Sequence, residues 1–189
     1  KRGMEWKDCL IEDVPEDVRY YHAGVFQGGD KKLSEAWVIF LSAVQADGNY
    51  PKQGGGIVFT FSRERKILRL TKALQEVCLE ASVKVRKQST YIYIPVASEA
   101  CKVAKALMPN KQLGPWLLDY NRETLDLFCK EVFFWDGNST RNTEFCSSDR
   151  ANVDWVQVLF TISGRRARLR LNREATETLR DNWIVSTTA

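Results

Sequence analysis

The sequence contains only one histidine, His22, among its 189 residues. A single imidazole excludes a metal site built on two histidines and argues against a nuclease centre based on histidine. His22 lies in the aromatic stretch YYHAGVF, where we interpret it as a structural residue. The five cysteines include no C-x-x-C pair, which argues against a zinc knuckle and favours reduced thiols in an intracellular compartment.

Long hydrophobic runs and a large net charge are also missing. No apolar run approaches the roughly 20 residues that a membrane helix needs. The stretch KRGMEWKDCL at the start lacks the hydrophobic segment of a signal peptide, so we expect no membrane association. The net charge of +4 does not by itself indicate a nucleic-acid binder. Basic residues nevertheless cluster at 84–87 and 165–170, where a partner would meet a stronger field than the net charge suggests.

The sequence does contain a repeated pattern in which an apolar run ends in Asp-Gly-Asn. The pattern appears in FLSAVQADGN (40–49) and again in CKEVFFWDGN (129–138). Each run predicts a helix that stops at this tripeptide, and Ser34 and Asn121 are suitable N-terminal caps. A chain of this length folds either as one domain or as two fused halves.

The elements after each run are predicted in a similar order. In the first half they are a strand (57–61), a helix (63–81), a hairpin (83–88 and 90–96) and a closing helix (97–108). In the second half they are a hairpin (139–148), a helix (149–163), a strand (165–171) and a short helix (173–183). We therefore predict an α+β fold with two duplicated halves. Its expected divisions are an N-terminal extension (1–32), a first half (33–108), a linker (109–121) and a second half (122–189).

Each Asp-Gly pair lies at a predicted helix C-terminus. We expect the glycine to act as a C-cap that tolerates positive φ. Because the C-terminal pole of a helix is negative, a carboxylate there is unfavourable by up to ~1 kcal/mol unless a cation compensates it. If the two helices pack about a pseudo-twofold axis, Asp47, Asp136 and the last carbonyls (Ala46 and Trp135) converge into an oxygen site that suits Mg²⁺. The alternative is that Asp-Gly-Asn is a common turn signal, but two copies in matching contexts favour the metal site.

Both motifs resemble a known family. FLSAVQADG (40–48) and CKEVFFWDG (129–137) are similar to the paired motifs of LAGLIDADG homing endonucleases, particularly those found in inteins. NKQLGPWLL (110–118) resembles the segment in which the intein-type enzymes carry a lysine, here Lys111. FCSSDRANVDWVQVLFTISG resembles the serine-rich turn and long helix that follow the second motif. The resemblance extends over about residues 33–172.

The resemblance implies a monomer with two αββαββα-like halves, the motif helices at their interface and a saddle-shaped antiparallel sheet facing duplex DNA. It implies that Asp47 and Asp136 bind Mg²⁺, with Mn²⁺ as a substitute, and that both strands of a long asymmetric target are cut with short 3′ overhangs. Lys111 would supply positive charge near the phosphate, and the alternative is a surface lysine of the linker. Gln45, which replaces the usual acidic residue of the first motif, completes the expected catalytic set.

Two features depart from the family pattern. Glu131 and Trp135 are large where the second motif usually has small residues, which predicts a wider helix separation and leaves nicking, slow cleavage or lost activity open. The chain starts with Lys1 and ends in VSTTA, so we do not expect it to splice by itself. Residues 2–17 are a host-domain remnant, a covering segment or an extra DNA contact, and the sequence does not choose among these.

Duplex recognition uses polar side chains on strands and cations on phosphates. Strand alternation predicts that Val83 and Val85 face the helices while their neighbours face DNA, although a solvated sheet face would alternate in the same way. The expected DNA-contacting residues are Asn49, Tyr50, Lys52, Gln53, Lys84, Arg86, Lys87, Gln88, Asn138, Ser139, Arg141, Asn142, Arg166, Arg168 and Arg170.

Three hypotheses follow from the sequence. The first is a site-specific DNA endonuclease. The second is a catalytically idle relative, either an RNA maturase or a DNA-binding regulator. The third is a structural α+β domain whose two Asp-Gly pairs are only turns. We favour the first because both aspartates and Lys111 are present.

Overall fold

A computed structural model of the chain describes residues 26, 28–52, 55–137, 144–176 and 180–188. The first half contains α1 (Glu35–Asp47), β1 (Ile57–Phe61), α2 (Glu64–Val77), β2 (Ser82–Val85), β3 (Thr90–Ile94) and α3 (Glu99–Leu107). A 3₁₀ helix (Pro115–Asp119) leads into the second half, which contains α4 (Arg122–Asp136), β4 (Glu144–Ser147), α5 (Arg150–Ile162), β5 (Arg166–Arg173) and β6 (Asn182–Thr188). The predicted α+β class with two duplicated halves is confirmed.

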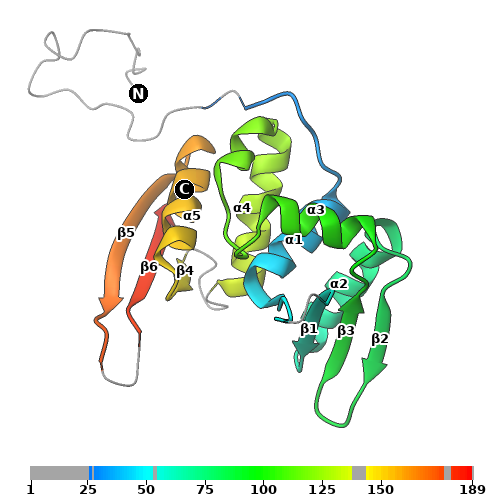
Figure 1. The fold of residues 1–189 in the computed structure, drawn as a ribbon. Coiled ribbons are helices and arrows are strands. Elements are labelled where there is room, and N and C mark those ends of the chain that lie inside the picture. The colour runs from blue at the N-terminus through cyan, green and yellow to red at the C-terminus, as the bar shows by residue number, and fades with distance from the viewer. Residues whose placement is uncertain (1–25, 27, 53–54, 138–143, 177–179, 189) are drawn as a thin grey trace, which may run out of the picture.

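Each half forms a three-stranded antiparallel sheet with the same arrangement. The strand orders are β1-β3-β2 and β4-β6-β5, so the last strand of each half lies in the middle of its sheet. α1 and α4 lie side by side between the two sheets, and β2 and β5 lie at opposite outer edges (Figure 1). Single bridges join Asn49 to Val58 of β1 and Gly137 to Phe145 of β4. The chain that leaves each motif helix therefore pairs with the first strand of its own half.

The N-terminal caps of the two motif helices are as predicted. The Ser34 side chain accepts a hydrogen bond from the backbone N–H of Trp37, and the Asn121 side chain accepts one from the backbone N–H of Thr124. These bonds satisfy N–H groups that have no partner inside the first helical turn. Both caps thereby define where the apolar helices begin.

Both motif glycines are the C-caps of their helices, as predicted, but the expected positive φ is wrong. Gly48 has φ −65° and Gly137 has φ −78°, so neither adopts the left-handed conformation that favours glycine. The structure gives a steric reason instead. A Cβ at Gly48 would lie 2.7 Å from the carbonyl oxygen of Val44, and one at Gly137 would lie 2.3 Å from that of Phe133. The chain therefore turns so closely against the last helical turn that no side chain fits.

The predicted short helix at 173–183 is also wrong. β5 continues to Arg173, and the chain returns as β6, which pairs Trp183 with Leu171 and Ile184 with Arg170. β-branched residues favour such a strand, and the stretch IVSTT at 184–188 is rich in them. Ile184 and Val185 are buried, so the sheet gains a central strand that a helix could not supply.

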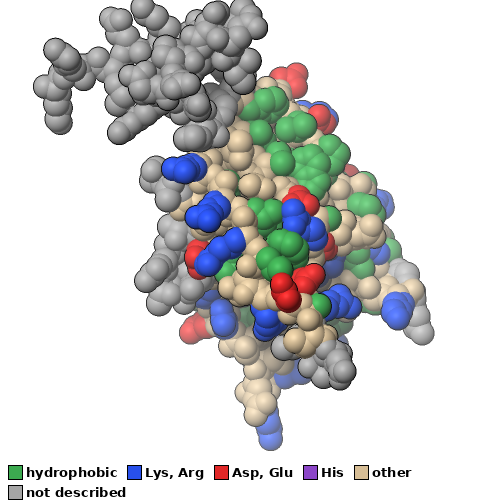
Figure 2. All heavy atoms as spheres, turned by 90° about the vertical axis from the view of Figure 1, so that its left-hand side faces the viewer, with side chains coloured by type: hydrophobic (Ala, Val, Ile, Leu, Met, Phe, Trp, Pro, Cys, Tyr) green, Lys and Arg blue, Asp and Glu red, His purple; other side chains and the backbone are tan. Residues whose placement is uncertain are grey.

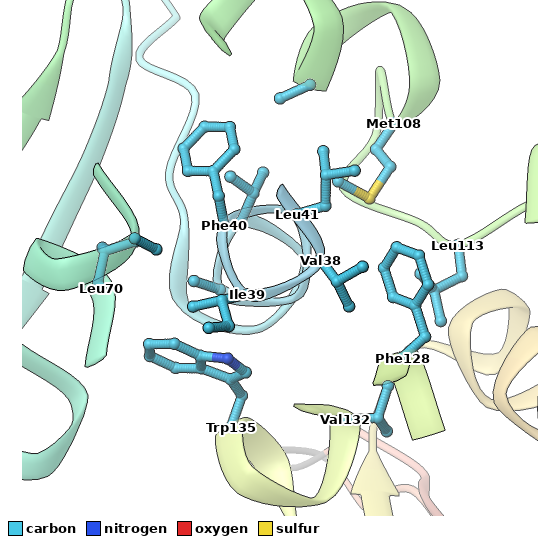
Figure 3. Packing of buried hydrophobic residues seen from close by; sticks show 14 of the residues in the cluster. Val38, Ile39, Phe40, Leu41, Leu70, Met108, Leu113, Phe128, Val132 and Trp135 are labelled. Carbon is cyan, nitrogen blue, oxygen red and sulfur yellow. The ribbon is translucent and has the colours of Figure 1, made fainter. Parts of the chain in front are cut away.

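α1 is the central element of the hydrophobic core. Its residues from Val38 to Gln45 are all buried, so it has no solvent-facing stripe. Figure 3 shows its side chains radiating toward different neighbours, with Trp135, Val132 and Phe128 of α4 on one side and Leu70 of α2 on another. The two halves therefore share one hydrophobic core, and α1 lies at its centre.

The outer strand β2 extends beyond this core. Val83 pairs with the buried Ile92 and so lies on the helix-facing side of the sheet, as predicted. It is nevertheless 46% exposed, and Val85 is 82% exposed. The valines of β2 thus face the helix side of the sheet but stay exposed, because no helix covers the outer edge of the sheet among the described residues.

Gly137→Ala and Gly48→Ala are expected to lower the free energy of unfolding by about 2–3 kcal/mol each, because the added methyl group meets backbone atoms that cannot move aside. Urea denaturation measures the loss. Gly55→Ala is the control, because its Cβ would lie 3.4 Å from Pro51 in ordinary contact. An equal, small effect at all three positions would contradict the steric explanation.

Candidate metal and nucleic-acid site

The C-terminal ends of α1 and α4 open into one cavity of about 380 Å³. Asp47 from α1 and Asp136 from α4 both line it. The other lining residues come from the end of β1, the turn into α2, the start of α2 and the end of α4: Thr60, Phe61, Ser62, Arg63, Lys66, Trp135 and Gly137. The structure therefore brings together the two aspartates that the sequence places almost half a chain apart.

Lys66 supplies the cation that the first helix end requires. Its ammonium lies 2.5 Å from Oδ2 of Asp47 and 5.6 Å from the ring centroid of Trp135. Lys66 is 7% exposed, which is unusual for a lysine and requires a paired charge. This residue compensates the carboxylate at the negative pole of α1.

Asp136 is held in a less favourable environment. Burial is the main cause that raises its pKa to about 6, and the nearby charge of Asp47 raises it further. Lys66 and Lys111 act in the opposite direction, because positive charge favours the carboxylate. The two motif carboxylates are thus close enough to repel one another, which is the situation that a bound cation relieves.

Lys111 lies in the turn after α3 and is not among the residues that line the cavity. Its φ is 61°, a conformation that residues other than glycine seldom adopt. The buried Asn152 at the start of α5 stabilises this turn: its Nδ2 donates to the carbonyl of Lys111 at 3.3 Å, and its Oδ1 accepts from the N–H of Leu113 at 2.9 Å. The turn that carries Lys111 is thus bonded to the second half, and the positive charge of Lys111 favours the ionised form of Asp136.

Glu131 is accommodated by an ion pair with α2. Its buried carboxylate accepts from Nε of Arg69 at 2.9 Å and is also bonded to Nη2 of the same guanidinium. Arg65 donates to the carbonyl of Phe134 at 3.0 Å, and both arginines lie over the Phe134 ring. Trp135 packs against Phe61 of β1, with 5.8 Å between ring centroids. The large residues of the second motif thus bind the two halves to each other.

The donor set of the cavity fits a hard divalent cation. Two carboxylates are present, and the last carbonyls of each helix have no partner within the helix. Trp135, expected to supply such a carbonyl, lines the cavity, whereas Ala46 is not among its lining residues. Within the described part of the chain, no group of three or more acidic, histidine or cysteine side chains is placed to hold a metal. The remaining ligands of a cation would therefore come from water and from a phosphate. Gln45, expected in the catalytic set, is buried and is not among the lining residues.

The DNA contacts expected in the first half lie in different surroundings. Asn49 and Lys52 are exposed, as are Lys84, Arg86, Lys87 and Gln88 on and after β2. Tyr50 differs, because its hydroxyl donates to the carbonyl of Met108 at 3.0 Å and burial raises its pKa to about 12. That hydroxyl is engaged inside the first half.

The contacts expected in the second half centre on β5. Arg166, Arg168 and Arg170 are exposed and alternate with the partly buried Ala167 and Leu169, as predicted. Arg170 also pairs with Glu144 of β4 at 3.3 Å, which reduces the positive charge of this face. Viewed from the side of β5, Lys and Arg side chains are spread over the surface with acidic side chains among them (Figure 2). The expected residues Gln53, Asn138, Ser139, Arg141 and Asn142 lie outside the described residues.

Lys66, Asn152 and Glu144 were missed by sequence reasoning. A signal for Lys66 was present, because it lies four residues before Leu70 on the stripe of α2 that also contains Ala73, Leu74 and Val77. A lysine on a core-facing stripe indicates a buried partner. Asn152 and Glu144 gave no comparable signal, because their partners are distant in sequence.

Comparison with known proteins supports the fold. No protein-family model and no curated protein matches the chain. The backbone is similar to the homing endonuclease I-DmoI in complex with DNA and Ca, with TM-score 0.58, 12% identity, and coverage of 82% of this chain and 83% of that one. A variant of I-DmoI with its target DNA in the presence of Mg gives TM-score 0.58, 11% identity, and coverage of 82% and 89%.

The N-terminal LAGLIDADG domain of DUF199/WhiA is also similar, with TM-score 0.51, 15% identity, and coverage of 82% of this chain and 78% of that one. The chain therefore has the two-part LAGLIDADG fold. At these identities the likeness concerns the fold alone. A further finding is that none of the described helices has the length and apolar character needed to cross a membrane.

The raised pKa of Asp136 predicts a pH dependence of stability. The unfolded chain has the ordinary pKa of 3.8 and the folded protein about 6, so between these values the folded state keeps a proton that the unfolded chain has lost. The free energy of unfolding therefore falls as pH rises from below 4 to above 6, by about 3 kcal/mol in all, of which about 2 kcal/mol is lost between pH 4.5 and 8. Asp136→Asn should remove this fall. Urea denaturation at pH 4.5 and 8 measures it, with the exposed Asp154→Asn as control, and parallel profiles for wild type and Asp136→Asn would refute it.

Proposed function

We propose that this chain, which has the LAGLIDADG fold, is a site-specific homing endonuclease that cuts duplex DNA by metal-dependent phosphodiester hydrolysis. The observation that carries the proposal is the meeting of Asp47 and Asp136 in one cavity between two sheets that present cationic residues. A fold used only for structure gives no reason to place two repelling, partly buried carboxylates at the negative ends of two helices. The similarity to I-DmoI structures with DNA and divalent cations supports the same proposal.

In this proposal the cation is Mg²⁺, with Mn²⁺ as a substitute, held by Asp47, Asp136 and the carbonyls of Ala46 and Trp135. A divalent cation supplies Lewis acidity and lowers the pKa of a bound water, which is the chemistry of phosphodiester hydrolysis. The protein supplies the fixed carboxylates and the charge of Lys111. Its ammonium stabilises negative charge on a phosphate that lies beside Asp136.

The partner is double-stranded DNA with a long asymmetric target site. The outward sheet faces carry Lys84, Arg86 and the arginines of β5, which suit the phosphates along the duplex. The halves differ in charge and in loop chemistry, and a monomer with unequal halves fits an asymmetric target. Short 3′ overhangs and an intein-type arrangement, with Lys111 preceding the second motif, belong to the same proposal.

A second candidate function is duplex binding without cleavage. The observation in its favour is the Lys66–Asp47 ion pair, because an ammonium that always holds Asp47 would exclude a cation from that carboxylate. Binding that weakens steeply with salt and is equal in Mg²⁺ and EDTA, with no product on DNA carrying the uninterrupted host site, would favour this candidate.

The endonuclease proposal is tested with Asp47→Asn and Asp136→Asn. Each is expected to slow cleavage of at least one strand by ~100-fold or more, because an anionic ligand is lost while the shape remains. Gel assays on DNA carrying the uninterrupted host site, with Mg²⁺ and then with EDTA, measure cleavage, and gel shifts measure binding, which should remain. Asp154→Asn, an exposed aspartate of α5, is the matched control. Wild-type rates in both motif variants would reject the proposal.

Lys111→Ala is expected to slow one strand much more than the other and to leave a nicked intermediate, because its charge acts beside Asp136 in the second half. Strand-resolved gels with supercoiled and end-labelled DNA measure both rates. Lys130→Ala, an exposed lysine of α4, is the control. Equal slowing of both strands would mean that Lys111 serves both carboxylates, and no slowing would mean that it has no part in cleavage.

A further inference from the structure

The two halves supply lysine charge to their motif carboxylates by different routes. Lys66 is the third residue of α2 and Asn152 is the third residue of α5, and they follow the ends of β1 and β4, at Phe61 and Ser147, by five residues each. Since the halves share their element order and sheet topology, Lys66 and Asn152 occupy equivalent positions. One is a buried cation and the other a buried amide.

The amide at the equivalent position does not contact its own motif carboxylate. Asn152 instead bonds the turn that carries Lys111, through the carbonyl of Lys111 and the N–H of Leu113. Lys111 then acts on Asp136 through its charge. Within the described residues, the ion pair that Lys66 makes with Asp47 has no counterpart at Asp136. In the described part of the chain, Asp47 therefore has a lysine ammonium in contact with its carboxylate, whereas Asp136 has none.

We propose that Lys66 is the internal counterion of the first site: its ammonium takes the place of a divalent cation at Asp47 and leaves that carboxylate when the cation binds. The inference rests on the proposed function, because it requires a cation at the motif carboxylates. It adds that the free protein has unequal sites, with Asp47 blocked by the ammonium and Asp136 open.

The position of Lys66 favours competition between its ammonium and a metal cation for Asp47 over a role in which the ammonium only stabilises the carboxylate. An ammonium 2.5 Å from Oδ2 of Asp47 occupies the oxygen that a hard cation would need, and two cations at one oxygen repel each other. Lysine is also suited to leave, because its charge lies at the end of a flexible four-carbon chain. Lys66 lines the cavity, so its ammonium can move into the cavity without leaving the site.

The test is Mn²⁺ binding to the free protein, measured by isothermal titration calorimetry and by Mn²⁺ electron paramagnetic resonance. Lys66→Met keeps an unbranched side chain with as many atoms as the aliphatic part of lysine and removes the ammonium, and it is expected to bind Mn²⁺ about 10-fold more tightly than wild type. Lys66→Arg keeps the charge and should stay close to wild type. Lys72→Met, an exposed lysine of the same helix, is the control. Adding Asp47→Asn to Lys66→Met should cancel the gain, which a double-mutant cycle isolates.

Thermal denaturation gives a second readout. Without metal, Lys66→Met should lower Tm by about 2–4 °C, because Asp47 loses its partner, and Mn²⁺ should raise Tm more in the variant than in wild type. Lys66→Gln is measured alongside, so that a folding defect specific to methionine is recognised. Equal or weaker Mn²⁺ binding by folded Lys66→Met and Lys66→Gln would overturn the counterion inference whatever the cleavage assays show. A gain in Mn²⁺ affinity together with no DNA cleavage by wild type would reject the endonuclease and keep the inference.

Discussion

The burial of α1 on every side is the constraint on which the other features depend. A helix with no solvent-facing stripe needs neighbours all round, and α2 of its own half covers only part of it. α4 covers another part, so the second half completes the core of the first (Figure 3). This packing aligns the C-terminal ends of α1 and α4, and the two motif aspartates meet because the helices do.

The same packing creates an electrostatic problem at the site. Two carboxylates lie at the negative ends of two helices, and the pKa of Asp136 is raised by burial and by Asp47. The protein compensates with cations from outside the motif helices, Lys66 from α2 and Lys111 from the turn that Asn152 holds. The two halves thus repeat the same backbone arrangement but distribute charge unevenly, and chemistry at the two carboxylates need not be equivalent.

The contacts between halves are likewise uneven. Arg69 and Arg65 of α2 reach across to Glu131 and Phe134 of α4, whereas the equivalent helix α5 holds the Lys111 turn through Asn152. Glu131, a departure from the small residue of the family motif, is stabilised by a two-pronged bond to a guanidinium. These interactions fix the relative position of the two sheets and hence of the surfaces proposed to contact DNA.

The sequence by itself determined the duplicated α+β order, the caps at Ser34 and Asn121, and the position of Asp47 and Asp136 at matching helix ends, because periodicity, capping and a repeated motif are local signals. It did not determine the strand at 182–188, whose place in the sheet depends on pairing with β5. The motif glycines are required by the carbonyl four residues before each of them, which is a local constraint. The exposure of Val83 and Val85 and the partners of Lys66 and Glu131 were decided only by the tertiary structure. Each of these features depends on contacts between residues that are far apart in the chain, and a local sequence pattern does not specify such contacts.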